Sequence, residues 1–227
     1  MTPPPLTLYI HVPWCVRKCP YCDFNSYKKP ELVPEARFVD VLLQDLRQDL
    51  TWIGKPRELT SIFIGGGTPN LISGNQIIRL LTEIRALCSW RPSMEITMEI
   101  NAGITNDEWF CMYNAAGVNR LSLGVQSLNP KQLQALGRIH STDEVHQTIA
   151  SARKAGFTNL NLDLMFGLPQ QTINEATQDL LQIINLQPQH ISWYQLTIEP
   201  NTIFFRKPPL LPDEDLIWMI QNQGEEL

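Results

Sequence analysis

Residues 9–27 read YIHVPWCVRKCPYCDFNSY and carry three cysteines in a C-x3-C-x2-C spacing. One loop can therefore bring Cys15, Cys19 and Cys22 together. Cysteine thiolates are the usual ligands of iron–sulfur clusters, and a cubane cluster contains four irons. Three protein ligands would leave one iron open to another molecule. The segment predicts a [4Fe–4S] cluster with an open coordination site.

Two other interpretations of the cysteines, a structural zinc site and a disulfide framework, fit the sequence less well. A structural zinc site uses four ligands, usually in two pairs, and no second C-x2-C pair occurs; only His11, four residues before Cys15, could complete a set. A disulfide framework is typical of short, cysteine-dense secreted chains. This chain has 227 residues and 5 cysteines, and its start, MTPPPLTLYI, lacks the pattern of a secretory signal. We expect a reduced, cytoplasmic protein.

Composition and charge argue against two classes of partner. The formal net charge is −5, and Lys and Arg are scattered, so we expect no binding to nucleic acid or to an anionic membrane surface. No apolar run approaches the roughly 20 residues that span a bilayer, so we expect no integral membrane segment. The spread of motifs predicts one domain, residues 1–227, which is long enough to bury a sizeable core.

Alternating apolar and polar residues predict six strands, each followed by a helix. The strands are expected at 6–12, 60–64, 95–101, 120–126, 159–166 and 190–198, and the helices at 35–50, from 73, at 105–116, at 130–155 with a break, at 174–186 and from 212. This alternation implies a parallel sheet. The units run from about residue 6 to 224, with a proline-rich loop at 199–212.

Three of the predicted strands, 95–101, 120–126 and 159–166, share a pattern of one apolar and one polar face. The apolar faces must meet the helices, so the polar faces must line the interior, whereas a closed eight-stranded barrel would place branched apolar residues there. We expect an incompletely closed (βα)6 barrel around a ligand cavity. Chemistry gathers at the C-terminal strand ends of such barrels, where the following residues fall: Cys15, Gly66, Gly67, Thr68, Glu99, Gln126 and Asp163.

The glycine run at 65–67 ends the second predicted strand and is followed by Thr68. Three glycines permit positive φ and let a ligand lie against bare backbone. A phosphate loop is the competing interpretation, but neither G-K-[ST] nor G-x-G-x-x-G follows. The run therefore predicts a contact surface for a ligand.

The cysteine spacing, with Tyr21 before the third cysteine, resembles the radical S-adenosylmethionine (SAM) superfamily. Within it, six segments are similar to the coproporphyrinogen III oxidase-like family and most of all to its heme chaperone (HemW) subgroup: LYIHVPWCVRKCPYCDFNS, IFIGGGTPNLIS, GVNRLSLGVQS, LGRIH, NLDLMFGLP and SWYQLTIEPNT. The resemblance covers Leu6 to Leu216. It implies the partial (βα)6 TIM-like barrel of radical SAM proteins, with a [4Fe–4S] cluster on Cys15, Cys19 and Cys22.

The resemblance also implies binding of one or two SAM molecules and reductive cleavage of SAM to a 5′-deoxyadenosyl radical. It assigns cofactor contacts to Tyr9, Tyr21, Gly66, Gly67, Thr68, Glu99, Gln126, Arg138 and Asp163, and it assigns no catalytic residue. Carboxylates can accept hydrogen bonds from ribose hydroxyls or an ammonium group, and Arg138 can fork onto a carboxylate. Each of these residues alone could instead make a structural polar contact.

Two functions follow from the resemblance. The first is a heme chaperone that binds heme and transfers it to an acceptor protein. The alternative is an oxygen-independent coproporphyrinogen III oxidase acting on a porphyrinogen. Oxidases of the family carry a fourth cysteine two positions after the third, where this chain has Phe24. We therefore favour the chaperone branch and expect no oxidase activity.

The chain departs from the family in two places. The family motif E-A-N-P-G is here EINAG at 99–103, and the H-N-x-x-Y-W motif associated with heme does not occur. Both branches continue into a further C-terminal domain, so we expect a truncated member that binds heme weakly or not at all. His140, His146 and His190 are expected to be ordinary structural or surface histidines, with His11 facing the interior. Cys88 and Cys111 are expected to be buried in helices.

Overall fold

Six parallel strands form one curved sheet in the computed structural model, which describes residues 4–104 and 106–227. The sheet order β1-β4-β5-β6-β7-β8 follows the chain, and each neighbouring pair is parallel. The strands are β1 (Leu6–Val12), β4 (Leu59–Gly66), β5 (Trp90–Asn101), β6 (Arg120–Gln126), β7 (Leu160–Phe166) and β8 (His190–Gln195). Within the described residues β1 and β8 do not pair, so the predicted open six-unit barrel is confirmed.

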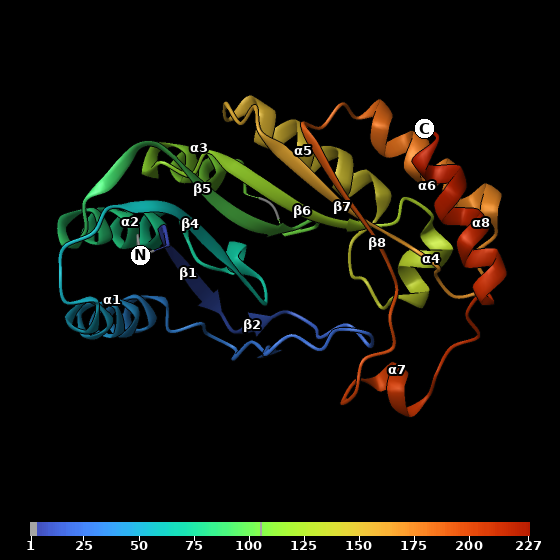
Figure 1. The fold of residues 1–227 in the computed structure, drawn as a ribbon, viewed down its shortest axis with the longest axis horizontal. Helices are drawn as coiled ribbons and strands as arrows, with labels where there is room; N and C mark the ends of the chain where they lie inside the picture. The colour runs from blue at the N-terminus through green and yellow to red at the C-terminus, as the bar shows by residue number, and fades with distance from the viewer. Residues whose placement is uncertain (1–3, 105) are drawn as a thin grey trace.

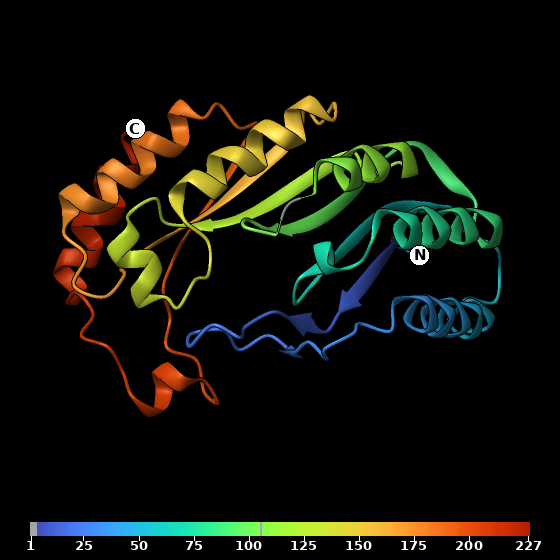
Figure 2. The same ribbon diagram turned by 180° about the vertical axis from the view of Figure 1, so that it is seen from behind.

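Helices follow the strands and cover one side of the sheet (Figures 1 and 2). They are α1 (Glu35–Ile53), α2 (Gly74–Leu87), α3 (Asp107–Ala116), α4 (Pro130–Ala135), α5 (Thr142–Lys154), α6 (Ile173–Asn185) and α8 (Glu214–Glu225). The cysteine segment and α7 (Ile203–Arg206) lie on the other side of the sheet (Figure 1). The helices therefore shield the apolar face and leave the polar face to the cavity.

Alternation within each strand separates the core from the interior. In β5, Ile96, Met98 and Ile100 are buried within the main hydrophobic cluster, together with alternate residues of the neighbouring strands. Thr97 and Asn161 point to the opposite face and are also buried, with exposed fractions of 0% and 1%. The interior is therefore packed with polar side chains that must hydrogen-bond one another, because buried polar groups without partners are costly.

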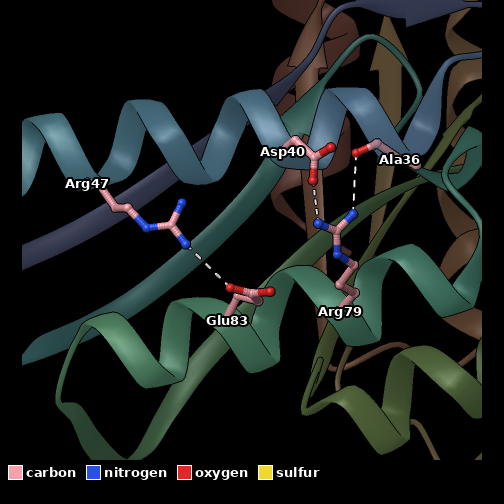
Figure 3. Close-up of polar contacts among 5 residues, drawn as sticks. All are labelled: Ala36, Asp40, Arg47, Arg79 and Glu83. Carbon is pink, nitrogen blue, oxygen red and sulfur yellow. Dashed lines mark hydrogen bonds and ion pairs between the residues drawn. The ribbon is translucent and has the colours of Figure 1, made fainter.

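Helices α1 and α2 lie side by side on the outside of the barrel (Figure 3). Arg79 pairs with Asp40 and also donates to the Ala36 carbonyl, and Arg47 pairs with Glu83 at 3.5 Å. These side chains are about half exposed. Exposed pairs of this kind add little stability, so the packing of the two helices rests on their apolar faces.

The structure differs from the sequence predictions in several elements. Strand β5 begins at Trp90, five residues before the predicted start. The proline-rich loop contains the short helix α7, and the cysteine segment contains two-residue strands, β2 (Trp14–Cys15) and β3 (Tyr27–Lys28), all of which were missed. The 3-10 helix η1 (Pro69–Leu71) follows the glycine run. Thr105, the predicted start of a helix, lies outside the described residues, and α3 begins at Asp107.

The predicted burial of Cys111 is wrong, because its side chain is exposed, whereas Cys88 is buried as predicted. On α3, Phe110 and Tyr113 are the residues that enter the core, so Cys111, one position after Phe110, is directed away from it. No described helix is long and apolar enough to cross a membrane.

Candidate cofactor site at the open mouth of the barrel

A cavity of about 430 Å³ opens at the C-terminal ends of the strands. The residues that line it come from the cysteine segment, the glycine run and the polar face of the sheet. They include eleven of the twelve predicted site residues: Cys15, Cys19, Tyr21, Cys22, Gly66, Gly67, Thr68, Glu99, Gln126, Arg138 and Asp163. The sequence prediction of a polar cavity at this edge agrees with the structure.

Tyr9 is the predicted site residue that the structure does not bring to the cavity. It is 56% exposed and stacks on Phe63, its partner in the β1–β4 register, with ring centroids 6.1 Å apart. Phe63 precedes the glycine run, so Tyr9 lies below the mouth of the barrel. Its hydroxyl lies 2.9 Å from Nδ1 of His11.

His11 connects the first strand to the cysteine segment. Its Nε2 donates to the carbonyl of Asn25 at 2.8 Å, so Nδ1 of the neutral ring accepts from the Tyr9 hydroxyl. The ring also lies against the glycine run, because a Cβ built on Gly66 would come 2.6 Å from its Cε1. Gly66 has a φ of +109°. A larger residue at position 66 would therefore be strained and would clash with the His11 ring.

The three cysteines are free thiols on one wall of the cavity. Cys15 is buried, and Cys19 and Cys22 close a turn in which the Cys22 amide donates to the Cys19 carbonyl at 3.2 Å. Lys18 pins the turn by donating to the carbonyls of Phe24 and Ser26, at 2.7 and 3.2 Å. These hydrogen bonds join residues of the same loop and stabilise its conformation.

The donor set of three cysteine thiols fits an iron–sulfur cluster, whose usual ligands are cysteine thiolates. Among the residues that the structure describes, no three His, Cys, Asp or Glu side chains are gathered as ligands of one metal ion. A cubane takes each cysteine on a different iron, so its ligands stand apart around a shared space. Burial raises the pKa of the Cys22 thiol, and metal binding would release its proton.

Glu99 and Asp163 are the two cavity carboxylates that lie on the strands of the sheet. The Gly66 amide donates to Oε2 of Glu99 at 2.9 Å. Burial raises the pKa of Glu99 to about 7, the bond from Gly66 opposes the rise, and the charge of Asp163 adds to it. Burial also raises the pKa of Asp163, against hydrogen bonds from Asn161 and Ser122. Burial therefore acts against the ionised form of both carboxylates, and hydrogen bonds to each of them favour that form.

Arg138 reaches the cavity from the loop after α4. Its Nη2 donates to the carbonyl of Gly124 at 2.8 Å and to Oδ1 of Asn101 at 3.1 Å, and its Nη1 lies 3.7 Å from Sγ of Cys19. The Nε atom is buried without a partner in the described chain, as is the hydroxyl of Thr68. The cavity thus presents a guanidinium and a free hydroxyl beside the cysteines.

Several residues that line the cavity were not predicted as site residues, among them Asn101, Ser122 and Tyr194. The Tyr194 hydroxyl donates to Oε1 of Gln126 at 2.7 Å, and Gln126 has a left-handed backbone with φ +71°. Asn101 and Ser122 lie on the polar faces that were predicted to line the interior, so the alternation itself contained the signal. Tyr194 occupies the corresponding position near the end of β8.

A comparison with protein families agrees with this geometry. The model of the radical SAM superfamily matches residues 9–183, from the strand before the cysteines through α6. The chain belongs to the radical SAM superfamily. Membership implies a [4Fe–4S] cluster and SAM as cofactors.

Two curated relatives of this radical SAM chain are heme chaperones HemW, from Haemophilus influenzae at 52% identity and from Escherichia coli at 51%. Each match covers 99% of this chain and 59% of the relative, so the chain spans less than two thirds of their length. A bovine relative, "Radical S-adenosyl methionine domain-containing protein 1, mitochondrial", is 36% identical over 96% of the chain and 50% of its own length.

Solved structures show the same radical SAM fold. Coproporphyrinogen III oxidase (HemN) from Escherichia coli superposes with a TM-score of 0.87 at 27% identity, covering 98% of this chain and 52% of the oxidase. Methylornithine synthase superposes with a TM-score of 0.63 at 14% identity, covering 97% of this chain and 62% of the synthase. The second likeness shows the fold alone.

Proposed function

We propose that Cys15, Cys19 and Cys22 hold a [4Fe–4S] cluster and that SAM lies in the cavity beside it. The observation that carries this proposal is the shared cavity, which three thiols and eight other predicted residues line together. Two buried polar groups that have no partner among the described residues support it, the hydroxyl of Thr68 and Nε of Arg138. Such groups gain a hydrogen bond when a polar ligand enters.

The chain's own residues would orient SAM by charge. Arg138 offers a donor to a carboxylate, whereas Glu99 and Asp163 offer acceptors to an ammonium or to ribose hydroxyls. A cation placed beside Glu99 favours its ionised form, which offsets the effect of burial on its pKa. When bound, the cluster and SAM supply one-electron chemistry that yields a 5′-deoxyadenosyl radical, and the protein supplies position and exclusion of water.

We further propose that the core belongs to a cytoplasmic heme chaperone, which binds heme and transfers it to an acceptor protein. The supporting observations are the 51–52% identity to heme chaperones over 99% of the chain and Phe24 at the position where oxidases of the family carry cysteine. Because the sequence lacks the H-N-x-x-Y-W motif, we expect these 227 residues to bind heme weakly or not at all.

A chimera tests the chaperone proposal. Residues 1–227 replace the matched region of the Haemophilus influenzae relative, which supplies the remaining 41% of its own length. We expect the chimera to bind heme, seen by its Soret band, and to pass it to an apo-hemoprotein. A folded, cluster-loaded chimera that binds no heme, or never releases it, would contradict the proposal. The variant His11→Ala checks whether the core itself contributes a ligand.

The likeness to coproporphyrinogen III oxidase keeps oxidase activity as the second candidate. Anaerobic incubation of the cluster-loaded chimera with SAM, a reductant and coproporphyrinogen III separates the two functions. We expect no decarboxylated product. Formation of protoporphyrinogen would favour the oxidase over the chaperone.

A further inference from the structure

A layer of polar side chains lies directly beneath the cavity in the C-terminal half of the barrel. The strand register aligns Ser122 of β6 with Asn161 of β7 and Asn161 with His190 of β8. Asp163 lies two residues after Asn161 on the same face of β7. It is aligned with Ser192 and lines the cavity. The cavity carboxylate therefore rests on a layer contributed by three neighbouring strands.

Asn161 is the centre of this layer and is 1% exposed. Its Nδ2 donates to Oδ1 of Asp163 at 2.7 Å and to Oγ of Ser122 at 2.8 Å. Its Oδ1 lies 2.5 Å from Nδ1 of His190 and accepts from Oγ of Ser192 at 3.1 Å. The side-chain amide is thus engaged on both sides, with the carboxylate on one and the imidazole on the other.

The chemistry of the groups gives this network a direction. An ionised carboxylate only accepts, so the Asn161 amide must turn its NH2 toward Asp163 and its carbonyl toward His190. His190 must then carry a hydrogen on Nδ1. Ser122 accepts from Asn161 and is left free to donate to Asp163, whose two oxygens lie 3.3 Å from its Oγ. His190 and Ser192 therefore donate to Asn161, and Asn161 and Ser122 donate to Asp163.

We propose that Asn161, oriented by His190, is a positioning residue that keeps Asp163 ionised and aimed into the cavity. This inference rests on the proposed function, because Asp163 is one of the predicted SAM contacts. His190 opens β8 and is exposed to solvent. A surface histidine and a cavity carboxylate are thus joined through one buried amide.

Asp163 has charged or titratable neighbours on each strand around it. Glu99 faces it from β5, Arg120 from β6, and Tyr194 and His190 from β8. Burial raises the pKa of Asp163, and the bonds from Asn161 and Ser122 and the charge of Arg120 oppose the rise. Loss of the Asn161 donor should therefore raise the pKa of Asp163 further and protonate it at a higher pH.

The direct test is NMR on the protein without cofactors, which needs no SAM. Carboxyl-carbon titration measures the pKa of Asp163 in the parent and in Asn161→Leu, and the nitrogen shifts of His190 report which ring nitrogen carries hydrogen. We expect the Asp163 midpoint to rise by about one pH unit in Asn161→Leu, the size of one lost charge-assisted bond. We also expect the neutral His190 to be protonated on Nδ1.

Variants of His190 provide a second test of the proposal if Asn161→Leu does not fold. His190→Phe removes the donor at an exposed position, and His190→Gln retains an NH2 group that can replace it. We expect the Asp163 midpoint to rise by a few tenths of a pH unit in His190→Phe, in line with cooperative strengthening along a hydrogen-bond chain, and to return toward the parent value in His190→Gln. His146→Gln, at another exposed histidine, should change nothing.

A SAM titration then links the network to the cavity. It is run in a Glu99→Gln background, so that Asp163 is the remaining carboxylate on the strand wall of the cavity, and SAM affinity is measured against pH with and without Asn161→Leu. We expect the acid loss of affinity to begin about one pH unit higher in Asn161→Leu. Failure of SAM to bind the parent at all would contradict the proposed function, whereas the NMR results would still decide the network. An unchanged Asp163 midpoint in Asn161→Leu and His190→Phe, or a His190 protonated only on Nε2, would overturn the inference.

Discussion

The two walls of the cavity are built in different ways. The cysteine wall is a loop, residues 13–28, whose only regular structure is the two-residue pair β2 and β3. The strand wall carries Glu99, Gln126 and Asp163 on the inner face of a six-stranded sheet. The loop is held by its own turns, by His11 and by contacts to distant elements, such as the bond from the Phe204 amide to the Pro20 carbonyl. The strand residues are instead fixed by register and by a packed core beneath them.

The difference between the two walls predicts that cluster loading and folding of the domain depend on different residues. A binding loop on the surface can be ordered by its metal at little cost to the rest of the domain. A preorganised polar face must instead be formed before any ligand arrives, because its side chains share the sheet with the core. Loop variants should therefore affect cofactor loading alone, and strand variants should affect both ligand affinity and stability.

The largest expected effect is loss of the cluster in Cys19→Ser. Anaerobic reconstitution followed by iron and sulfide analysis should show almost no cluster, because a thiolate ligand is missing. Chemical denaturation of the apo chain should give a free energy of unfolding within about 0.5 kcal/mol of the parent. Cys111→Ser is the matched control, since Cys111 is exposed on α3, and it should load normally. A barrel that unfolds in Cys19→Ser would break the contrast between the walls.

The second effect concerns the strand wall. Glu99→Ala should weaken SAM binding to the cluster-loaded chain by about ten- to a hundredfold, because hydrogen bonds to charged groups are worth roughly 1.5–3 kcal/mol. Glu95→Ala is the control, since Glu95 lies on the same strand but is exposed and outside the cavity. Isothermal titration with SAM measures both. Equal affinities in the two variants would remove Glu99 from the contact set.

The third effect is a pH dependence of stability that Glu99 of the strand wall should contribute. The folded-state pKa of Glu99 is about 7, above the ordinary value of 4.5, so its favourable contribution is present below pH 4.5 and is lost as the pH rises to 7. At 1.36 kcal/mol per pH unit this amounts to at most about 3 kcal/mol. Denaturation of the apo chain across this range should show the loss, and Glu99→Gln should lack it. Parallel curves for parent and variant would contradict the burial of this carboxylate.

The smallest effect is expected on the outer helices. Arg47→Ala and Arg79→Ala each remove an exposed ion pair between α1 and α2 (Figure 3). Each should cost less than about 1 kcal/mol in the free energy of unfolding, and less still in high salt. A larger, salt-independent loss would show that the outer shell carries stability that we assign to the sheet and its core.

Much of the fold was predictable because alternation is a local signal. Strands β1 and β6 have the predicted bounds, and the polar faces of β5, β6 and β7 line the interior as expected. The elements that were missed depend on distant contacts. Helix α7 is fixed where the Phe204 amide donates to the carbonyl of Pro20, 184 positions earlier in the chain, at 3.0 Å, and no local pattern could indicate that contact.

The candidate site shows the same division. Cysteine spacing and family motifs point to eleven residues that do line the cavity. Tyr9 was also predicted, because a motif does not indicate how far a residue lies from the C-terminal ends of the strands. The network that we propose for Asn161 and His190 was not predicted, for a different reason. Their meaning depends on the register between β7 and β8, which sets Asn161 beside His190 and which the sequence does not state.

The central claim is that one cavity holds both the cluster and SAM, with one iron open to the second cofactor. It is tested most directly by electron paramagnetic resonance of the reconstituted, reduced chain before and after SAM is added. We predict a [4Fe–4S] signal that changes on addition of SAM in the parent and in Glu95→Ala, and that requires a higher SAM concentration in Glu99→Ala. A fully loaded cluster whose signal is the same with and without saturating SAM would contradict the claim.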